Sequence, residues 1–585
     1  MAILSPLIDR LRGVVPVLGW GRRYDRADLP SDLGAGLTVG AMLVPQAMAY
    51  ALLAGLPPEV GLYAATIPVL VYAFFGTSRQ LAVGPVAIVS LMTASALAPL
   101  VDEGTAGYLA AAALLAFMVG VVHLILGLGR LGFLVNFLSH SVLVGFTAAA
   151  ALIIGFSQVK HLIGVAIPRG EFFETAGELV RHLADAHSLT LAIGLGSVAI
   201  LLGLKRWAER VPGALVVVVA TTVASVLFDF EDRGVKVVGH IPDSLPAFGL
   251  PDFDGSLITS LATTAVIITV VGFMESIAVA KVYARRHRYD ISANQELIGL
   301  GVANLTSGLF GGYPVTGGFS RTAVNDTAGA RTPLASIVTA AVVVLTIALF
   351  TPLLTQLPNA ALGAIIVVAV AGLFDGAEIL RIARVKPTDL ISLSVAFVAT
   401  LVLGIEIGIG VAVAASLAVV FARMATPHYA VLGRVPDTTT WRNIARFPEV
   451  ERVAGLRVIR IDASLSFANA SFFKKLLLSE AASADEVPGQ PRCLVLDASG
   501  VNDIDATGIE ALREADLELA DRGISLHLAD AKGPVRDVLW RAGLWAELGE
   551  RAHATTEEAV VAILGERPSP CDPSQHRRTG TDERG

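Results

Sequence analysis

Two short stretches of sequence, Leu81-Ala-Val-Gly-Pro85-Val-Ala-Ile-Val-Ser90 and Tyr313-Pro-Val-Thr-Gly-Gly-Phe-Ser-Arg-Thr322, determine the architecture expected of this chain. Both are apolar, both are interrupted by glycine and proline, and each is too short to cross a bilayer as one continuous helix. Each is also the third member of a series of seven apolar segments. Matching broken segments in the two halves of a chain are typical of inverted-repeat transporters that bind their substrate near the middle of the membrane. The alternative is that glycine and proline only kink ordinary spans.

The composition around these stretches is that of a membrane protein. Hydrophobic residues make up 54% of the 585 residues and charged residues only 16%, whereas an ordinary soluble protein has about 25% charged residues. The mean hydropathy is +0.66. From Thr438 onward the charge density becomes that of a soluble domain. We therefore expect a cytoplasmic amphipathic segment over residues 1–31, a membrane domain over 32–424, a linker over 425–437, a soluble domain over 438–567 and a disordered tail over 568–585.

Fourteen apolar segments fit the membrane domain, as two sets of seven. The first set comprises residues 32–55, 60–76, 84–98, 107–128, 134–157, 188–204 and 213–228. The second set comprises residues 258–280, 293–310, 319–329, 333–355, 360–374, 389–404 and 406–422. The sequence therefore predicts a polytopic α-helical protein with 7+7 organisation.

The distribution of positive charge fixes the expected orientation, because cytoplasmic connections are enriched in lysine and arginine. Connections after even-numbered segments carry Arg79, Arg130, Lys205, Arg206, Arg210, Lys281, Arg285, Arg286, Arg288, Arg331, Arg381, Arg384 and Lys386. The opposite side carries only Lys160, Arg169, Arg181, Arg233 and Lys236. This asymmetry places the N-terminus and the C-terminal soluble domain in the cytoplasm.

The two broken segments predict an anion site. A helix that begins inside the membrane presents free backbone N–H groups and a partial positive charge of about +0.5 at its N-terminus, so two such ends facing each other attract an anion. The amides concerned belong to Val86, Ala87, Ile88, Phe319, Ser320 and Arg321. The hydroxyls of Ser320 and Thr322 are further candidate donors, and the glycines before each helix let an anion approach the backbone.

Two charged side chains lie well inside the predicted spans, Glu275 and Arg321, and such residues are functional hypotheses by default. Arg321 either coordinates the anion or locks its span to a carbonyl or carboxylate. Glu275 is either a proton carrier or the buried partner of Arg321. Gln46 follows Pro45 inside the first span, where its amide either binds the substrate or satisfies the carbonyls that the proline frees.

The carrier hypothesis for Glu275 has a physical basis. An ionised carboxylate about 6 Å from a dianion is repelled by roughly 5 kcal/mol at an effective dielectric constant near 20. Anion binding therefore favours protonation of the carboxylate, and by reciprocity protonation strengthens anion binding. Such coupling is what anion/proton symport requires, whereas a Glu275 held ionised by Arg321 favours an exchanger or a uniporter.

Several other classes of function are excluded or disfavoured. A net charge of −7 without a long basic run argues against nucleic acid as a partner. The chain has no Walker motif, no HExxH and no paired CxxC, so we expect no ATP-driven pumping, no metal site and no cofactor. Gly127-Leu-Gly129-Arg-Leu-Gly132 matches a dinucleotide-binding pattern, but it follows a membrane span rather than a strand of a βαβ unit, so we reject it.

Strand and helix patterns alternate after Leu456, which predicts a small α/β domain. The expected strands are 456–461, 492–499 and 524–529, and the expected helices are 468–478, 506–522, 535–542 and 557–564. Asp503, Asp505 and Thr507 lie between a strand and the start of a helix. They either cap the helix or form a regulatory loop that binds a ligand.

These motifs together resemble the SulP sulfate permeases, also called solute carrier family 26. The similar runs are Pro45-Gln46-Ala-Met-Ala-Tyr50-Ala-Leu-Leu-Ala-Gly-Leu-Pro-Pro58, Ser276-Ile-Ala-Val-Ala-Lys281, Asn294-Gln295-Glu296-Leu-Ile, and Phe319-Ser320-Arg321-Thr322-Ala-Val-Asn325. The C-terminal part resembles the STAS domain that such permeases carry. The resemblance implies core and gate subdomains, a substrate site between the third and tenth spans, elevator-type alternating access and a homodimer.

Two departures from the family pattern carry consequences. Some bacterial relatives have an acidic residue where Gln46 stands, so a coupling carboxylate here must lie elsewhere, which favours Glu275. In phosphorylated STAS proteins a serine follows the aspartate of the motif, whereas Ala506 follows Asp505 here. Phosphorylation at that position is therefore excluded.

From these features we expect a multi-pass protein of the inner (plasma) membrane that takes up sulfate with protons and is not an enzyme. Bicarbonate or a dicarboxylate, carried with sodium, is the alternative within transport. A membrane-anchored regulator, whose STAS domain binds a protein or a nucleotide, is the alternative from another class.

Overall fold

The computed structural model describes residues 15–133, 139–165, 167, 172–208, 211–239, 245–453, 455–482 and 493–565. The chain divides into two compact units, Met1–Ser416 and Leu417–Gly585. Residues 1–14 of the predicted N-terminal amphipathic segment (1–31) and the predicted tail lie outside the described residues.

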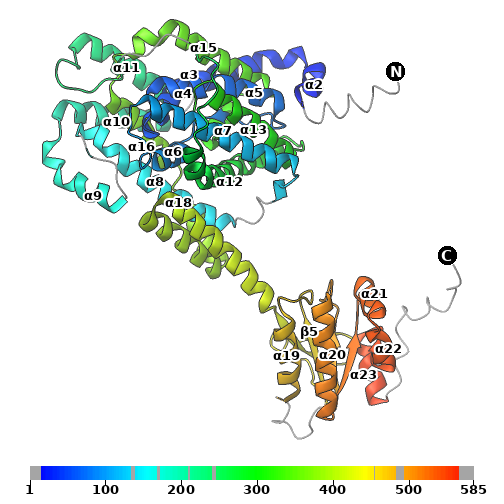
Figure 1. Ribbon diagram of the computed structural model, residues 1–585. Helices are drawn as coiled ribbons and strands as arrows, with labels where there is room; N and C mark the ends of the chain where they lie inside the picture. The colour runs from blue at the N-terminus through cyan, green and yellow to red at the C-terminus, as the bar shows by residue number, and fades with distance from the viewer. Residues whose placement is uncertain are drawn as a thin grey trace, which may run out of the picture. The chain divides into compact units, whose positions relative to one another are not determined.

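The first unit is a bundle of helices (Figure 1). Its first half contains α3 (Leu29–Leu53), α4 (Pro58–Ala64), α5 (Ile67–Phe75), α6 (Ala87–Leu97), α7 (Ala106–Leu128), α8 (His140–Ile163), α9 (Phe172–Arg181), α10 (Ser188–Trp207) and α11 (Gly213–Phe228). Its second half contains α12 (Gly255–Arg286), α13 (Ala293–Leu309), α14 (Phe319–Thr327), α15 (Leu334–Leu354), α16 (Asn359–Ala371), α17 (Gly376–Val385) and most of α18 (Pro387–Ala425), whose last residues belong to the second unit. α18 is broken at Gly404, which has φ 80°.

Each of the fourteen predicted segments corresponds to helix in the described part of the chain. Nine of the described helical spans are long and apolar enough to cross a membrane. Three shorter apolar helices, Ala87–Leu97, Gly213–Phe228 and Gly410–Ala425, together with α13 and α14, account for the remaining segments. The protein is therefore a multi-helical membrane protein.

Several predicted boundaries need correction. The segment predicted at 134–157 is α8, which runs from His140 to Ile163. The segment predicted at 60–76 consists of two helices, because the chain turns at Ala65 and Thr66. The helices α9 and α17 were not predicted, since their apolar residues cover one face only and do not form a continuous apolar run.

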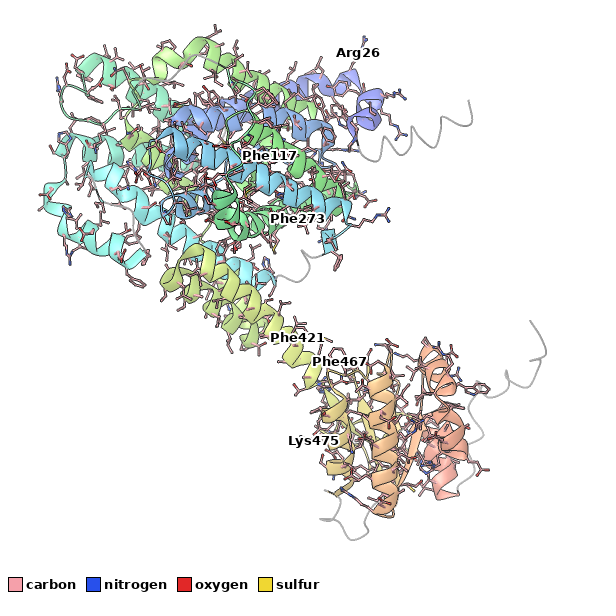
Figure 2. The ribbon with its side chains drawn as sticks, in the orientation of Figure 1. Arg26, Phe117, Phe273, Phe421, Phe467 and Lys475 are labelled. Carbon is pink, nitrogen blue, oxygen red and sulfur yellow. The ribbon has the colours of Figure 1, made fainter. Side chains whose placement is uncertain are left out.

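The packing of the helices follows the 7+7 order. α3 packs against α15, and their counterparts in the other half, α12 and α7, also pack together. Likewise α7 packs against α13, as α15 packs against α5. Figure 2 shows Phe117 of α7 and Phe273 of α12 within this bundle. These matched contacts bring the two broken segments to the same place in the unit.

A buried carboxylate ties the start of α13 to the end of α5. Glu296 has no exposed surface. It accepts hydrogen bonds from the Tyr72 hydroxyl (2.6 Å), from the Thr77 amide and hydroxyl (2.6 and 2.5 Å) and from the Ser78 amide (3.0 Å). Glu296 belongs to one of the runs that resemble the permeases, and its contacts are structural.

Replacing Glu296 with alanine is expected to destabilise the membrane unit by about 3 kcal/mol or more, because it leaves several buried donors without an acceptor. The melting temperature of the purified protein in detergent checks this. Asp232→Ala, at an exposed loop position, should leave the melting temperature unchanged. Equal melting temperatures for the Glu296 variant and the wild type would contradict the assignment.

The second unit has a six-stranded sheet in the order β4-β3-β5-β6-β7-β8. The strands are β3 (Tyr429–Arg434), β4 (Trp441–Asn443), β5 (Leu456–Ile461), β6 (Cys493–Asp497), β7 (Ser525–Ala529) and β8 (Ala552–His553). The helices are α19 (Ala470–Ala482), α20 (Ala506–Asp521), α21 (Gly533–Arg541), α22 (Leu544–Leu548) and α23 (Thr556–Leu564). Side chains of α19 and α20 cover one face of the sheet, and those of α23 cover the other.

The predicted α/β domain is present, but its sheet begins earlier in the chain than residue 438. β3 lies within the predicted linker and pairs antiparallel with both β4 and β5. β4 and β8 are only three and two residues long, so neither leaves an alternating pattern in the sequence. The three predicted strands, β5, β6 and β7, pair in parallel, and β8 continues the parallel series.

Candidate functional site

The two broken segments meet in a short antiparallel crossing. Val83 pairs with Gly317, and Gly84 pairs with Thr316, as strands β1 (Val83–Gly84) and β2 (Thr316–Gly317). The Gly318 amide extends this ladder by donating to the Ala82 carbonyl at 3.1 Å. The crossing satisfies backbone groups that would otherwise be unpaired inside the membrane unit.

Each strand leads directly into a helix that starts inside the bundle. α6 begins at Ala87 after Val86, and α14 begins at Phe319 after Gly318. Neither start has a side chain that caps the free amides. Because the first N–H groups of a helix have no partner within it, both helix ends present donors and positive dipole ends at the crossing.

Arg321, in the first turn of α14, is 1% exposed. Its Nη1 donates to the carbonyl of Pro85 and to Oε1 of Gln46, the latter at 3.3 Å. Its Nε and Nη2 are buried and have no hydrogen-bond partner among the described residues. A buried guanidinium with two unpaired nitrogens carries a large desolvation cost, which an anion would offset.

Gln46 holds this guanidinium from α3. Its Oε1 accepts from Arg321, and its Nε2 donates to the Tyr50 hydroxyl at 3.1 Å. Gln46 therefore does not satisfy the carbonyls that Pro45 frees. Tyr50 was missed by the sequence reasoning, although its position four residues after Gln46 places both on one face of a helix.

Two glycines surround the guanidinium. Gly84 has φ +148°, a conformation that favours glycine, and a Cβ there would lie 3.4 Å from Nη2 of Arg321. A Cβ on Gly318 would lie 3.1 Å from the same nitrogen. The glycines therefore keep open the space around the unpaired part of Arg321.

If the crossing binds an anion, Gly318→Ala is expected to displace the guanidinium and to weaken that binding by about 1–3 kcal/mol, or about 5- to 150-fold. Titration of the purified protein with sulfate checks this. Gly196→Ala is the matched control, because a Cβ at Gly196 meets no atom within 4 Å. Unchanged affinity for sulfate in the Gly318 variant would show that the anion does not occupy the space around Arg321.

Glu275 lies on α12, and its Oε2 is buried without a hydrogen-bond partner among the described residues. Its carboxylate and the Arg321 guanidinium are close enough to interact electrostatically. The described residues include no direct ion pair between the two, since neither takes part in a salt bridge there. In the described part of the chain, Glu275 therefore does not lock Arg321 through an ion pair, and its role as a proton carrier stays a hypothesis.

The remaining predicted ligands of the anion differ in their accessibility. Val86, Ala87 and Ile88 are buried at the start of α6, whereas Phe319 and Ser320 are exposed at the start of α14. The Thr322 hydroxyl donates to the Gly318 carbonyl at 2.7 Å and accepts from the Ala82 amide at 3.1 Å. The structure thus uses Thr322 to hold the crossing and does not bring its hydroxyl to the site as a free donor.

Further hydroxyls that the sequence did not single out also hold the crossing. Ser276, next to Glu275, accepts from the Gly317 amide at 2.8 Å and lies 2.7 Å from the Thr316 hydroxyl. The Tyr313 hydroxyl lies 2.9 Å from that of Ser90. These contacts fix the β2 segment against α12 and α6.

In the C-terminal unit, Asp505 caps α20. Its carboxylate accepts from the Gly508 amide at 2.8 Å and from the Phe467 amide at 2.9 Å. Asp503 accepts from the Ile504 amide at 2.9 Å, and Thr507 is exposed. Of the two hypotheses for this loop, capping therefore applies to Asp505, and binding of a ligand stays a hypothesis for Asp503 and Thr507.

Comparison with known proteins agrees with this architecture. Residues 29–396 match the Sulfate permease family, and residues 447–559 match the STAS domain. The chloroplastic sulfate transporter 4.1 of Arabidopsis thaliana is 39% identical over 93% of this chain and 81% of its own length.

Two solved structures share the fold. The murine solute carrier 26 family member A9 anion transporter, in the inward-facing state, matches with a TM-score of 0.87 at 27% identity, covering 95% of each chain. The transmembrane domain of the cyanobacterial bicarbonate transporter BicA matches with a TM-score of 0.60 at 26% identity, covering 66% of this chain and 99% of that one.

Proposed function

Because this chain belongs to the sulfate permease family and is an anion transporter with a C-terminal STAS domain, we propose that it carries sulfate together with protons. The observation that carries the proposal is the buried Arg321 near the starts of α6 and α14, two of whose nitrogens have no hydrogen-bond partner in the described part of the chain. A tetrahedral dianion can accept hydrogen bonds from a guanidinium and from two sets of helix amides at once.

Each candidate residue has a role in this proposal. Arg321 and the amides near Ala87 and Ser320 bind the anion, and Gln46 positions Arg321. Glu275 takes up a proton when the dianion binds, since the two negative charges repel in a site of low dielectric constant. The proposal assigns transport to an elevator-type movement of the helices that carry the site, in a homodimer.

The orientation is part of the proposal. The excess of lysine and arginine after even-numbered spans supports a cytoplasmic STAS domain, and the proposal places the chain in the plasma membrane. The Arabidopsis relative is named chloroplastic, so the membrane that houses this chain is tested by fractionation of cells rather than assigned by similarity.

Uptake of labelled sulfate into proteoliposomes tests the function. An inward proton gradient should drive accumulation, and an ionophore that collapses the gradient should abolish it. Accumulation that follows an inward sodium gradient instead would replace the proton by sodium. Absence of sulfate uptake in folded protein would overturn sulfate as the substrate.

Bicarbonate is the second candidate substrate. The similarity to BicA favours it, and helix amides select an anion by charge and size rather than by its functional groups. Direct uptake decides between the two: labelled sulfate should accumulate and labelled bicarbonate should not if sulfate is the substrate, and the reverse should hold if bicarbonate is. A dicarboxylate is tested in the same assay.

A further inference from the structure

A basic cavity of about 440 Å³ lies in the C-terminal unit, and the predicted loop at Asp503 is not part of its lining. It is lined by residues next to the start of β3, in β4 and the loop after it, and at the end of β5. Those that matter for its charge are His428, Arg442, Arg446, Arg460 and Asp462. Three arginines on one cavity are a concentration of positive charge in a chain whose net charge is −7.

The acidic residue of the cavity is already neutralised. Asp462 accepts from Arg460 at 2.7 and 3.2 Å and lies 2.9 Å from Nδ1 of His428. Arg442 and Arg446 are exposed and form no ion pair among the described residues. The cavity therefore presents two uncompensated guanidinium groups.

The geometry of one of these groups is fixed by an aromatic ring. The Arg442 guanidinium lies 4.8 Å from the centre of the Phe447 ring, a cation–π contact that orders the side chain. An ordered guanidinium loses less entropy when it binds, and its planar fork matches phosphate oxygens. The ligand chemistry that fits is therefore a phosphate group.

The chain places this cavity close to a membrane helix. α18 ends at Ala425, and its apolar part, Gly410–Ala425, carries Arg423 in the last turn. His428 follows only three residues later, so it lies within about 10 Å of the end of the helix. Lipid headgroups surround the end of a membrane helix, so an anionic phosphate is available to a site that follows the helix so closely in the chain.

We propose that the cavity bounded by Arg442, Arg446 and Arg460 binds the phosphate headgroups of anionic lipids in the leaflet that faces the STAS domain. This inference rests on the membrane location of α18 and is independent of the transported anion. A soluble phosphate compound would use the same chemistry, but the distance to α18 favours the lipid. Binding holds the β3–β4 hairpin at the membrane surface.

Hydrogen–deuterium exchange of the full-length protein in nanodiscs tests the proposal. We expect backbone amides of residues 440–447 to exchange about tenfold more slowly in discs with phosphatidylglycerol than in discs of phosphatidylcholine alone. Near an anionic leaflet each arginine contributes about fivefold to the equilibrium constant. The double variant Arg442→Gln, Arg446→Gln should therefore lose this protection.

The matched control removes the same charge elsewhere on the unit. Arg522→Gln with Arg536→Gln should keep the protection, and exchange in β6 should be the same in all variants if they are folded. No difference between the two kinds of disc, or protection that survives in the Arg442 and Arg446 variant, would overturn the proposal. If 1 mM ADP slows exchange of these amides in phosphatidylcholine discs and phosphatidylglycerol does not, the ligand is a soluble phosphate compound and the lipid proposal is wrong.

Discussion

Replacing Arg321 with alanine is expected to weaken sulfate binding about 30-fold or more and to abolish uptake. The guanidinium is 1% exposed, and two of its nitrogens have no partner among the described residues. If these nitrogens bind the anion as proposed, the truncation breaks a buried, hydrogen-bonded charge pair, which costs about 2–5 kcal/mol. Calorimetric titration with sulfate measures the loss directly.

Arg321→Lys tests whether binding depends on the positive charge alone or also on the planar shape of the guanidinium. Lysine keeps a positive charge, but its ammonium group cannot donate to Pro85, Gln46 and an anion at once as the planar guanidinium can. The sulfate affinity should therefore lie between that of the wild type and that of the alanine variant. Arg233→Ala, at an exposed position, is the control and should bind as the wild type does. A folded Arg321→Ala protein with full affinity would show that Arg321 only ties α14 to the Pro85 carbonyl.

Glu275→Gln is expected to remove proton-driven accumulation while leaving sulfate exchange intact. A gradient of one pH unit supplies about 1.4 kcal/mol per proton, enough for about tenfold accumulation when the membrane potential is clamped. The glutamine keeps the shape of the side chain but cannot carry the proton. Proteoliposomes with and without a gradient measure both activities in one preparation.

The expected pH dependence has a definite sign. Protonation of Glu275 removes its repulsion of the dianion, so sulfate affinity should rise as the pH falls, and it should depend much less on pH in the glutamine variant. Asp102→Asn, outside the bundle core, should behave as the wild type. Gradient-driven accumulation that persists in the Glu275 variant would rule out this carboxylate as the proton carrier.

The broken segments, and therefore the place of the candidate site, could be predicted from the sequence. Glycine and proline at matching positions indicated that α6 and α14 start inside the bundle, and the β1–β2 crossing confirms that they meet. The partners of individual side chains could not be predicted in this way. Gln46 contacts a residue 275 positions away, and Thr322 holds the crossing because the fold brings Ala82 opposite it.

In the C-terminal unit, too, some elements could be predicted from the sequence and others could not. β6 leaves a nearly continuous apolar run, and β5 and β7 place polar, half-buried residues among buried apolar ones, so all three strands were predicted close to their observed positions. β3 lies next to the edge of the sheet beside the short strand β4, and its sequence near the end of a membrane helix looks like a linker. The basic cavity was not predicted either, because its arginines come from segments that only the fold brings together.

Locating the bound anion tests the proposed site without relying on any substitution. Selenate is a heavier analogue of sulfate, and anomalous diffraction from crystals of the protein soaked in it reveals the position of the selenium. We expect one tetrahedral anion at the β1–β2 crossing, within hydrogen-bond distance of Arg321 and of amides at the starts of α6 and α14. Selenate bound elsewhere in protein that transports sulfate, with this position empty, would contradict the assignment of the site.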